Sequence, residues 1–216
     1  MALTKVRGSG VDTVVLADST NLNFGTGSDA KIFHDGNNTK FQHTGTGGLY
    51  VGADTFAITN GATDTTHISI DANGHITKPL QPAFQVNATA DTNFAINAFH
   101  TVTFGTETFD QNGDFASNTF TAPVTGRYQL NLIGYFEDVA SSADYLQAEI
   151  TTSNRRYYGI TDPAGYDRTV TFLTLPVCVL ADMDANDTAT VRYYQSEGDV
   201  QIDLSANTYF SGYLVA

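Results

Sequence analysis

Hydrophobic and polar positions follow two different patterns along the chain, and the change falls near residue 80. Residues 84–216 contain runs in which apolar side chains occupy every second position. This alternation is typical of a β-strand with one buried face, and no segment has helical periodicity. Many such runs separated by turns predict an antiparallel β-sandwich. The clearest runs are Tyr128–Phe136, Thr188–Tyr194, Val200–Leu204 and Tyr209–Val215.

Residues 1–80 contain only short apolar groups, such as Leu49–Val51, broken by Gly, Asn, Asp and Thr. Two hairpins are predicted, because Asp35-Gly36 and Asn73-Gly74 lie between strand-like flanks and suit turns with positive φ. Such thin strands lack an intrachain core, so we expect them to bury their apolar faces against copies of themselves. A three-chain β-prism or intertwined stalk meets that need. The alternative is a flexible linker, which the recurring Ile, Phe, Leu and Tyr disfavour.

Composition agrees with strands and turns, since β-branched and aromatic residues are plentiful and charged residues make up only 15%. The formal net charge of −13 includes no basic stripe, which argues against nucleic-acid binding and against attraction to an anionic membrane. No stretch is apolar enough for a membrane helix, and the N-terminus lacks the apolar region of a signal peptide. We therefore expect synthesis in a cytoplasm without membrane insertion. The single cysteine, Cys178, lies in an apolar run and is expected to be a small buried residue.

The second region carries motifs that resemble the globular head of complement component 1q, within the tumour-necrosis-factor-like jelly-roll superfamily. Phe109–Phe115 (FDQNGDF) and Asn118–Leu130 (NTFTAPVTGRYQL) resemble the family's Gly-x-Phe and Phe-x-x-Pro-x-x-Gly-x-Tyr-x-Phe runs, with Leu130 in the last place. Asn186-Asp187 stands where the family usually has Gly-Asp before a strand. Phe210–Leu214 (FSGYL) matches the closing Phe-x-Gly-x-Leu, in which Gly212 indicates close packing. The resemblance implies a trimeric jelly roll.

The first region resembles repeats of phage structural proteins over roughly residues 15–80. The likeness lies in Leu22–Gly36 (LNFGTGSDAKIFHDG), Thr44–Tyr50 (TGTGGLY) and Ile70–Pro79 (IDANGHITKP). Together, the two resemblances predict an all-β fold: an N-terminal thin β-hairpin or β-prism stalk followed by an antiparallel jelly-roll β-sandwich head. The predicted parts are a virion-docking N-terminal segment (1–20), a β-rich trimeric stalk (21–80) and the head (81–216).

The function expected from this organisation is that of a homotrimeric phage tail fibre or tail-tip adhesin. It would reside in the virion, contact other virion proteins through its N-terminus and bind a host-surface glycan or protein with its head. A capsid-decoration or head-fibre protein of the same architecture is the alternative. A polysaccharide depolymerase is the enzymatic alternative. The sequence lacks a nucleophile elbow, a zinc-protease motif and a phosphate loop, so we expect no enzyme and assign no catalytic residue.

Two groups of residues in the head are candidate sites. Aromatic rings stack on sugars and arginines bond hydroxyl groups, which favours a receptor patch in the segment 155–166; strand packing with a trimer contact is the alternative. Clustered carboxylates suit Ca²⁺, although the spacing is not that of an EF-hand and an acidic turn accounts for them equally well. No other cofactor is expected. The receptor candidates are Arg155, Arg156, Tyr157, Tyr158 and Tyr166, and the metal candidates are Asp182, Asp184 and Asp187.

His34 is a weaker metal candidate. Three copies of this residue around a threefold axis would form a histidine ring. The paired histidine spacing found in such rings is absent here. A surface histidine in a hairpin is therefore the preferred interpretation.

Overall fold

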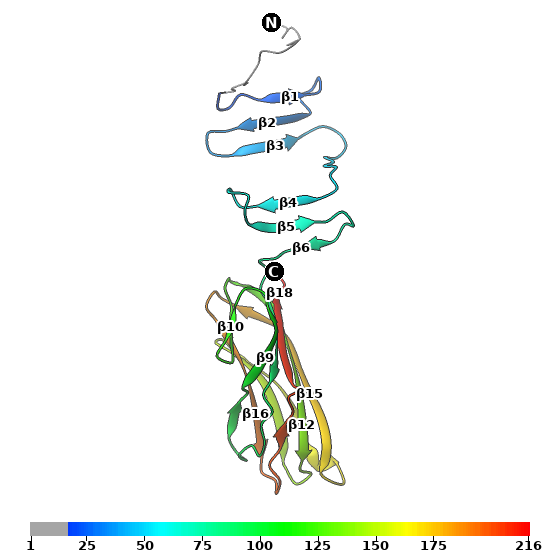
Figure 1. Ribbon diagram of the computed structural model, residues 1–216, viewed down its shortest axis with the longest axis vertical. Helices are drawn as coiled ribbons and strands as arrows, with labels where there is room; N and C mark the ends of the chain where they lie inside the picture. Colours follow the sequence, from blue (N-terminus) through cyan, green and yellow to red (C-terminus); the bar gives the residue numbers. More distant parts are fainter. Residues whose placement is uncertain (1–16) are drawn as a thin grey trace. The chain divides into compact units, whose positions relative to one another are not determined.

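The computed structural model describes residues 17–216, which fall into two units, 17–54 and 55–216. The first unit is a three-stranded antiparallel sheet in the order β1-β2-β3 (Figure 1). Its second hairpin turns at Asp35 and Gly36, as the sequence predicts: Gly36 has φ +95° and Asp35 Oδ1 accepts from the Asn37 and Asn38 amides at 3.0 and 2.8 Å. The strands are Leu22–Phe24 (β1), Ala30–His34 (β2) and Thr39–His43 (β3).

The second unit begins with another three-stranded antiparallel sheet, β4-β5-β6. The turn before β6 contains Asn73-Gly74, with Gly74 at φ +85°, and Asp71 Oδ1 accepts from the Asn73 and His75 amides. The second predicted hairpin is therefore confirmed. The strands are Phe56–Thr59 (β4), Thr66–Ile70 (β5) and Ile76–Thr77 (β6).

No side chain between residues 17 and 80 is buried. Large apolar residues in both small sheets keep a high exposed fraction, including Phe41 at 53% and Ile76 at 65%. Tyr50, which lies between β3 and β4 in the sequence, is 93% exposed. One copy of the chain thus leaves these apolar groups in water, as the sequence pattern predicts. The trimeric stalk itself stays a prediction. Of the predicted docking segment 1–20, all but the last four residues lie outside the described part.

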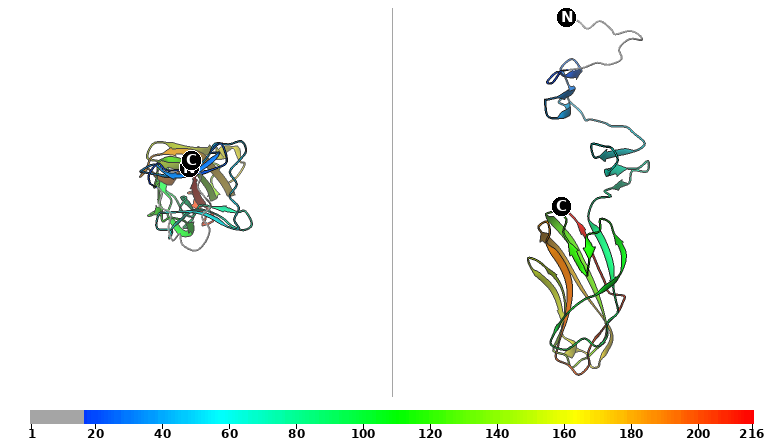
Figure 2. Two further views of the ribbon diagram at one scale, coloured as in Figure 1. Left: turned by 90° about the horizontal axis from the view of Figure 1, so that it is seen from above. Right: turned by 60° about the vertical axis from the view of Figure 1, so that its left-hand side comes forward.

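Residues 83–216 form two packed antiparallel sheets (Figures 1 and 2). The first sheet has the order β15-β12-β18-β7-β9, with β17 beside β12. The second has the order β10-β11-β16-β13-β14, with β8 beside β16. Most successive long strands cross between the sheets, as from β12 to β13 and from β15 to β16, while β13 and β14 form a hairpin within the second sheet. This pattern is that of a jelly roll, as the head motifs predict.

The strands of the first sheet include the two longest in the head, β12 and β15, which pair over almost their full length. They are Ala83–Ala88 (β7), Phe104–Asp110 (β9), Gly126–Val139 (β12), Val170–Met183 (β15), Asp203–Leu204 (β17) and Tyr209–Leu214 (β18).

The second sheet ends at β14, which is followed by a helical turn, η1 (Pro163–Gly165). Within the described residues no helix has the length and apolar content needed to span a bilayer. The strands are Phe99–Thr101 (β8), Phe115–Ala116 (β10), Thr119–Thr121 (β11), Tyr145–Thr152 (β13), Arg156–Thr161 (β14) and Thr188–Ser196 (β16).

The core lies between the two sheets and is rich in aromatic rings. Phe84 is 1% exposed and stacks on Phe115 and Phe120, with ring centroids 5.3 and 4.7 Å apart. A Cβ on Gly212 would lie 2.8 Å from Phe84 Cε1 and 2.7 Å from Leu130 Cδ2. The close packing predicted at Gly212 is confirmed, because no larger residue fits there without displacing the ring or the leucine.

Two expectations from the sequence are wrong. Cys178 is exposed, because it stands opposite Asn131 of β12 on the outer face of the sheet, while Val177 and Val179 take the inward positions. The Val200–Leu204 run is not one strand, and only Asp203–Leu204 pairs with β12. The buried Gln195 side chain instead bonds the Val200 carbonyl at 2.7 Å and the Ile202 amide at 3.1 Å, which holds the segment in an irregular conformation.

Candidate functional site

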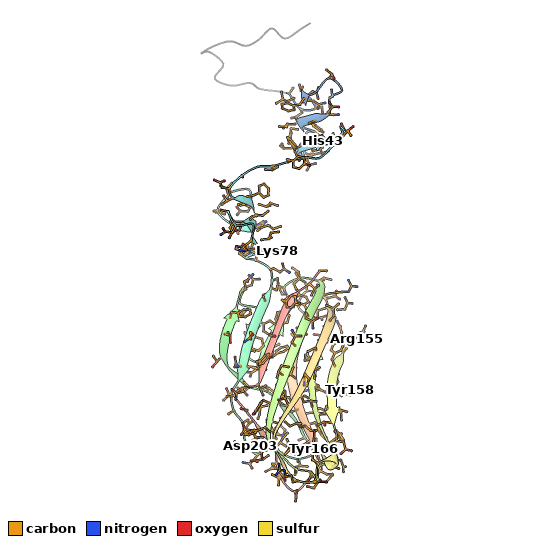
Figure 3. The ribbon with its side chains drawn as sticks, turned by 90° about the vertical axis from the view of Figure 1, so that its right-hand side faces the viewer. His43, Lys78, Arg155, Tyr158, Tyr166 and Asp203 are labelled. Atoms are coloured by element: carbon orange, nitrogen blue, oxygen red, sulfur yellow. The ribbon has the colours of Figure 1, made fainter. Side chains whose placement is uncertain are left out.

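The five residues of the predicted receptor patch do not form one patch. Figure 3 places Arg155 near one end of the sandwich, Tyr158 part-way along it and Tyr166 at the other end. Tyr157 points inward, opposite Ile150, and packs against the core. Only Arg156 and Tyr158 share a surface, the outer face of the second sheet, where they stand opposite Thr151 and Glu149 of β13.

This outer face contains a buried carboxylate held between two arginines. The Glu149 side chain is 0% exposed, although it points away from the core. Arg156 on β14 donates from Nε to Glu149 Oε2 at 3.0 Å and also from Nη2. Arg192 on β16 donates from Nε to Glu149 Oε1 at 2.7 Å and also from Nη2. We call Arg156, Glu149 and Arg192 the arginine clamp. It joins three neighbouring strands through their side chains.

Two neighbours on β13 complete the hydrogen bonding of Glu149. Gln147 Nε2 donates to Oε2 at 2.8 Å and Thr151 Oγ1 donates to Oε1 at 2.6 Å. Burial alone would raise the pKa of Glu149, but the hydrogen bonds from Arg156, Thr151 and Arg192 outweigh it, so the pKa lies below its ordinary value. Glu149 is therefore ionised at neutral pH, and its oxygens are occupied and shielded from solvent.

Aromatic rings surround the clamp. The ring centroid of Phe99 lies 5.0 Å from Cζ of Arg156 and 4.7 Å from Cζ of Arg192, within the range of cation–π attraction. Phe99 also contacts Tyr194 at 4.9 Å between centroids, and Tyr194 stacks on Tyr145 at 5.6 Å. The outer face thus carries a row of rings that ends at two guanidinium groups.

The sequence prediction missed Glu149, Arg192 and Phe99. The sequence shows no group around Glu149 because its arginine partners come from other strands, and Arg192 lies 43 residues away in the chain. One signal was available: Glu149 takes the polar position of the alternating run Tyr145–Thr152, and Arg156 follows it across a short loop. Opposite charges on adjacent strands of a hairpin often face one another.

The three aspartates predicted to bind calcium lie in two different environments, a turn and the outer face of the first sheet. Asp187 Oδ2 accepts from the Asp184 amide at 2.8 Å and from Asn154 Nδ2 at 2.6 Å, the bonding of an acidic turn. Asp182 stands opposite Arg127 on the outer face of the first sheet. Among residues 17–216, no three His, Cys, Asp or Glu side chains are grouped closely enough to hold a metal ion. Calcium binding stays a prediction for which this geometry adds no support.

His34 lies on β2, and its Nδ1 is 3.2 Å from Thr39 Oγ1 on the paired strand β3. The side chain is exposed. This position agrees with the preferred interpretation of a surface histidine in a hairpin. A histidine ring would need further copies of the chain and stays a prediction.

The outer face of the first sheet has a different character. The centre of this face is formed by β12 and by its paired strands β15 and β18. Between Gln129 and Tyr135 of β12, neither the outward residues nor their partners on the other two strands are charged. Several large side chains there are exposed, including Leu180 at 51% and Tyr213 at 48%. We call this surface the uncharged face. The further large apolar or aromatic residues on it are Ile133, Tyr135 and Tyr209.

Comparisons with known proteins find similarity in structure but not in sequence. No protein-family model matches the chain, and no curated protein matches its sequence. The globular domain of zebrafish complement 1qA is 16% identical with a TM-score of 0.45, and 63% of this chain covers 98% of that one. Murine APRIL at pH 8.0 is 13% identical with a TM-score of 0.46, and 62% of this chain covers 99% of that one. These neighbours are jelly-roll domains of the complement 1q and tumour-necrosis-factor type.

Proposed function

We propose that the protein is a homotrimeric fibre-like virion protein whose head attaches the particle to a host surface, and that it is not an enzyme. The observation that carries the proposal is the exposure of the apolar side chains in residues 17–80, none of which is buried in a single chain. Burying such surface is strongly favourable, so copies of the same chain are the natural partners. The resemblance of this region to phage structural repeats supports the assignment to a virion.

The uncharged face of the head supports the same oligomer. Interfaces between subunits are depleted of charged residues at their centre, and they are enriched in aromatic residues, Met and Arg. The uncharged face lacks charges at its centre and carries three tyrosines, Tyr135, Tyr209 and Tyr213, whereas the opposite face of the sandwich holds the charged arginine clamp. Trimerisation through the uncharged face therefore leaves Arg156 and Tyr158 open to a receptor, and three copies would add their affinities through avidity.

The first prediction concerns mass in solution. We expect the full chain to sediment at about three times its 23.2 kDa chain mass, because one copy cannot bury its apolar surface. Analytical ultracentrifugation over a range of concentrations measures this directly. A stable monomer with all of its strands formed would contradict the proposal.

Two matched variants identify the face used by the trimer. Leu180→Glu places a charge on the uncharged face, and Ile160→Glu places the same charge on the opposite face, at sites exposed by 51% and 52%. We expect L180E to dissociate at concentrations where the unmodified chain and I160E remain trimeric, because a buried unpaired charge is costly. Equal behaviour of the two variants would place the contacts elsewhere.

The second prediction concerns location. Antibodies against the head, imaged on whole particles, are expected to label the tail or tail tip and to block adsorption to host cells. Labelling over the capsid with normal adsorption would instead support the decoration protein. Release of oligosaccharides from host polysaccharide by the purified protein would contradict the absence of enzyme activity.

A further inference from the structure

The arginine clamp has an unusual charge for its surroundings. Residues 81–216 contain five arginines and no lysine, against sixteen Asp and Glu residues. Two of the five arginines meet at Glu149. Their two positive charges and its one negative charge leave a local excess of one positive charge in a strongly acidic head. Neutralising the carboxylate needs only one positive charge, so the remaining charge can attract another anion while both guanidinium groups stay bonded to Glu149.

The hydrogen-bonding capacity of the clamp points the same way. A guanidinium has five N–H donors and no acceptor. Each arginine uses Nε and Nη2 on Glu149, and among residues 17–216 no hydrogen bond to a protein group engages either Nη1. Glu149, the acceptor of the cluster, is fully buried, while the side chains of Arg156 and Arg192 are 47% and 29% exposed. The clamp therefore offers only positively charged donors to a ligand, and these bind the anionic acceptors carboxylate and sulfate more strongly than a neutral hydroxyl.

Flanking side chains define the rest of the ligand. Tyr158, on β14, stands opposite Glu149 of β13 and is 57% exposed. Phe99 is 42% exposed at the other side of the guanidinium groups, next to Tyr194. Rigid, half-exposed rings are favourable contact surfaces in recognition sites because little conformational entropy is lost on binding. Their flat faces suit the apolar faces of sugar rings.

We propose that the outer face formed by β14, β13, β16 and β8 binds an anionic polysaccharide, with an acidic group of the sugar on Arg156 and Arg192 and sugar rings against Tyr158 and Phe99. The inference rests on the proposed attachment function and specifies its receptor class. Both a carboxylate and a sulfate ester supply the required acceptors. A net charge of −13 repels polyanions at long range, so retention on such a polymer comes from this local site.

The test measures binding of the full-length protein to immobilised polygalacturonate, dextran sulfate and neutral dextran at physiological ionic strength. We expect retention by at least one of the two acidic polymers and none by dextran. Binding to polygalacturonate alone assigns a carboxylate, and binding to dextran sulfate alone assigns a sulfate. Equal retention on dextran, or no retention on any of the three, would overturn the inference.

Three variants locate the site. Arg156→Gln and Tyr158→Ala are each expected to weaken binding about tenfold, the effect of losing a contact to a charged group or ring. Tyr158→Ala keeps the clamp intact, so it tests the site without disturbing the fold. Arg155→Gln removes the same charge from the neighbouring residue, which has no bond to Glu149, and binding is expected to stay within about twofold. An equal loss in R155Q and R156Q would overturn the inference.

Binding to whole host cells separates this inference from the proposed function. If the unmodified protein binds cells and Y158A binds them equally well, the site on this face is wrong and the attachment function stands. If the unmodified protein binds no host cells, the attachment function itself is wrong.

Discussion

Replacing Phe84 with alanine is expected to lower the free energy of unfolding of the head by about 3–5 kcal/mol. The ring is 1% exposed and contacts Phe115, Phe120 and Phe210, with centroids 4.7 to 5.3 Å away. Its removal loses the transfer free energy of the ring and leaves a cavity that the surrounding aromatic groups cannot fill. Chemical denaturation monitored by tyrosine fluorescence measures the change.

The control for this variant is Tyr166→Ala, which also removes an aromatic ring but from a position that is 40% exposed in the loop after η1. We expect a loss of less than about 1 kcal/mol from it. Both variants are compared at one protein concentration, because the stability of an oligomer depends on concentration. Equal losses would show that the rings between the sheets do not form the principal core.

Substituting Glu149 is expected to produce a second large effect. Glu149→Ala leaves two guanidinium groups facing each other over a partly buried space, and removing one partner of a buried ion pair costs about 3–5 kcal/mol. Glu149→Gln keeps the shape and one carbonyl acceptor, so its loss is expected to be smaller. Chemical denaturation at neutral pH ranks the two variants. If E149A lowers the free energy of unfolding by less than about 1 kcal/mol, the clamp does not stabilise the fold.

The same residue gives a dependence on pH. Because the pKa of Glu149 is lower in the folded protein than its ordinary value of 4.5, ionised Glu149 stabilises the fold fully above that pH. The contribution decreases as pH falls through the lowered pKa. The stability difference between the unmodified protein and E149Q is therefore expected to be constant from pH 6 to 8 and to shrink below about pH 4. A difference that grows on acidification would contradict this sign.

Local features of the fold were predictable from the sequence because they depend on near neighbours. The turns at Gly36 and Gly74 follow from dipeptides that favour positive φ, and the inward positions of β12 follow from strict alternation. Gly212 was assigned from a motif, and the packing of Phe84 against it supplies the physical reason. At these positions the local sequence preference and the packing of the whole fold favour the same conformation.

The candidate site was less predictable because it is assembled across strands. Consecutive residues of β14 point to opposite faces, so Tyr157 and Tyr158 cannot belong to one surface, although they are adjacent in the sequence. Arg192 reaches Glu149 only through the pairing of β13 with β16, which alternation does not specify. Cys178 was misassigned for a related reason: β15 is apolar on both faces, and a continuous apolar run does not indicate which side is inward.

The chain enters and leaves the sandwich at the same end. There the Leu214 amide donates to the Pro82 carbonyl at 3.1 Å and the Arg127 amide donates to the Ala216 carbonyl at 2.7 Å. A tag fused after Ala216 would consequently emerge beside the incoming chain and crowd it. The loop between β14 and β15 lies at the opposite end of the sandwich, since Val170 pairs with Val139 at the last residue of β12. Engineered peptides intended for display are therefore better inserted in that loop than fused after Ala216.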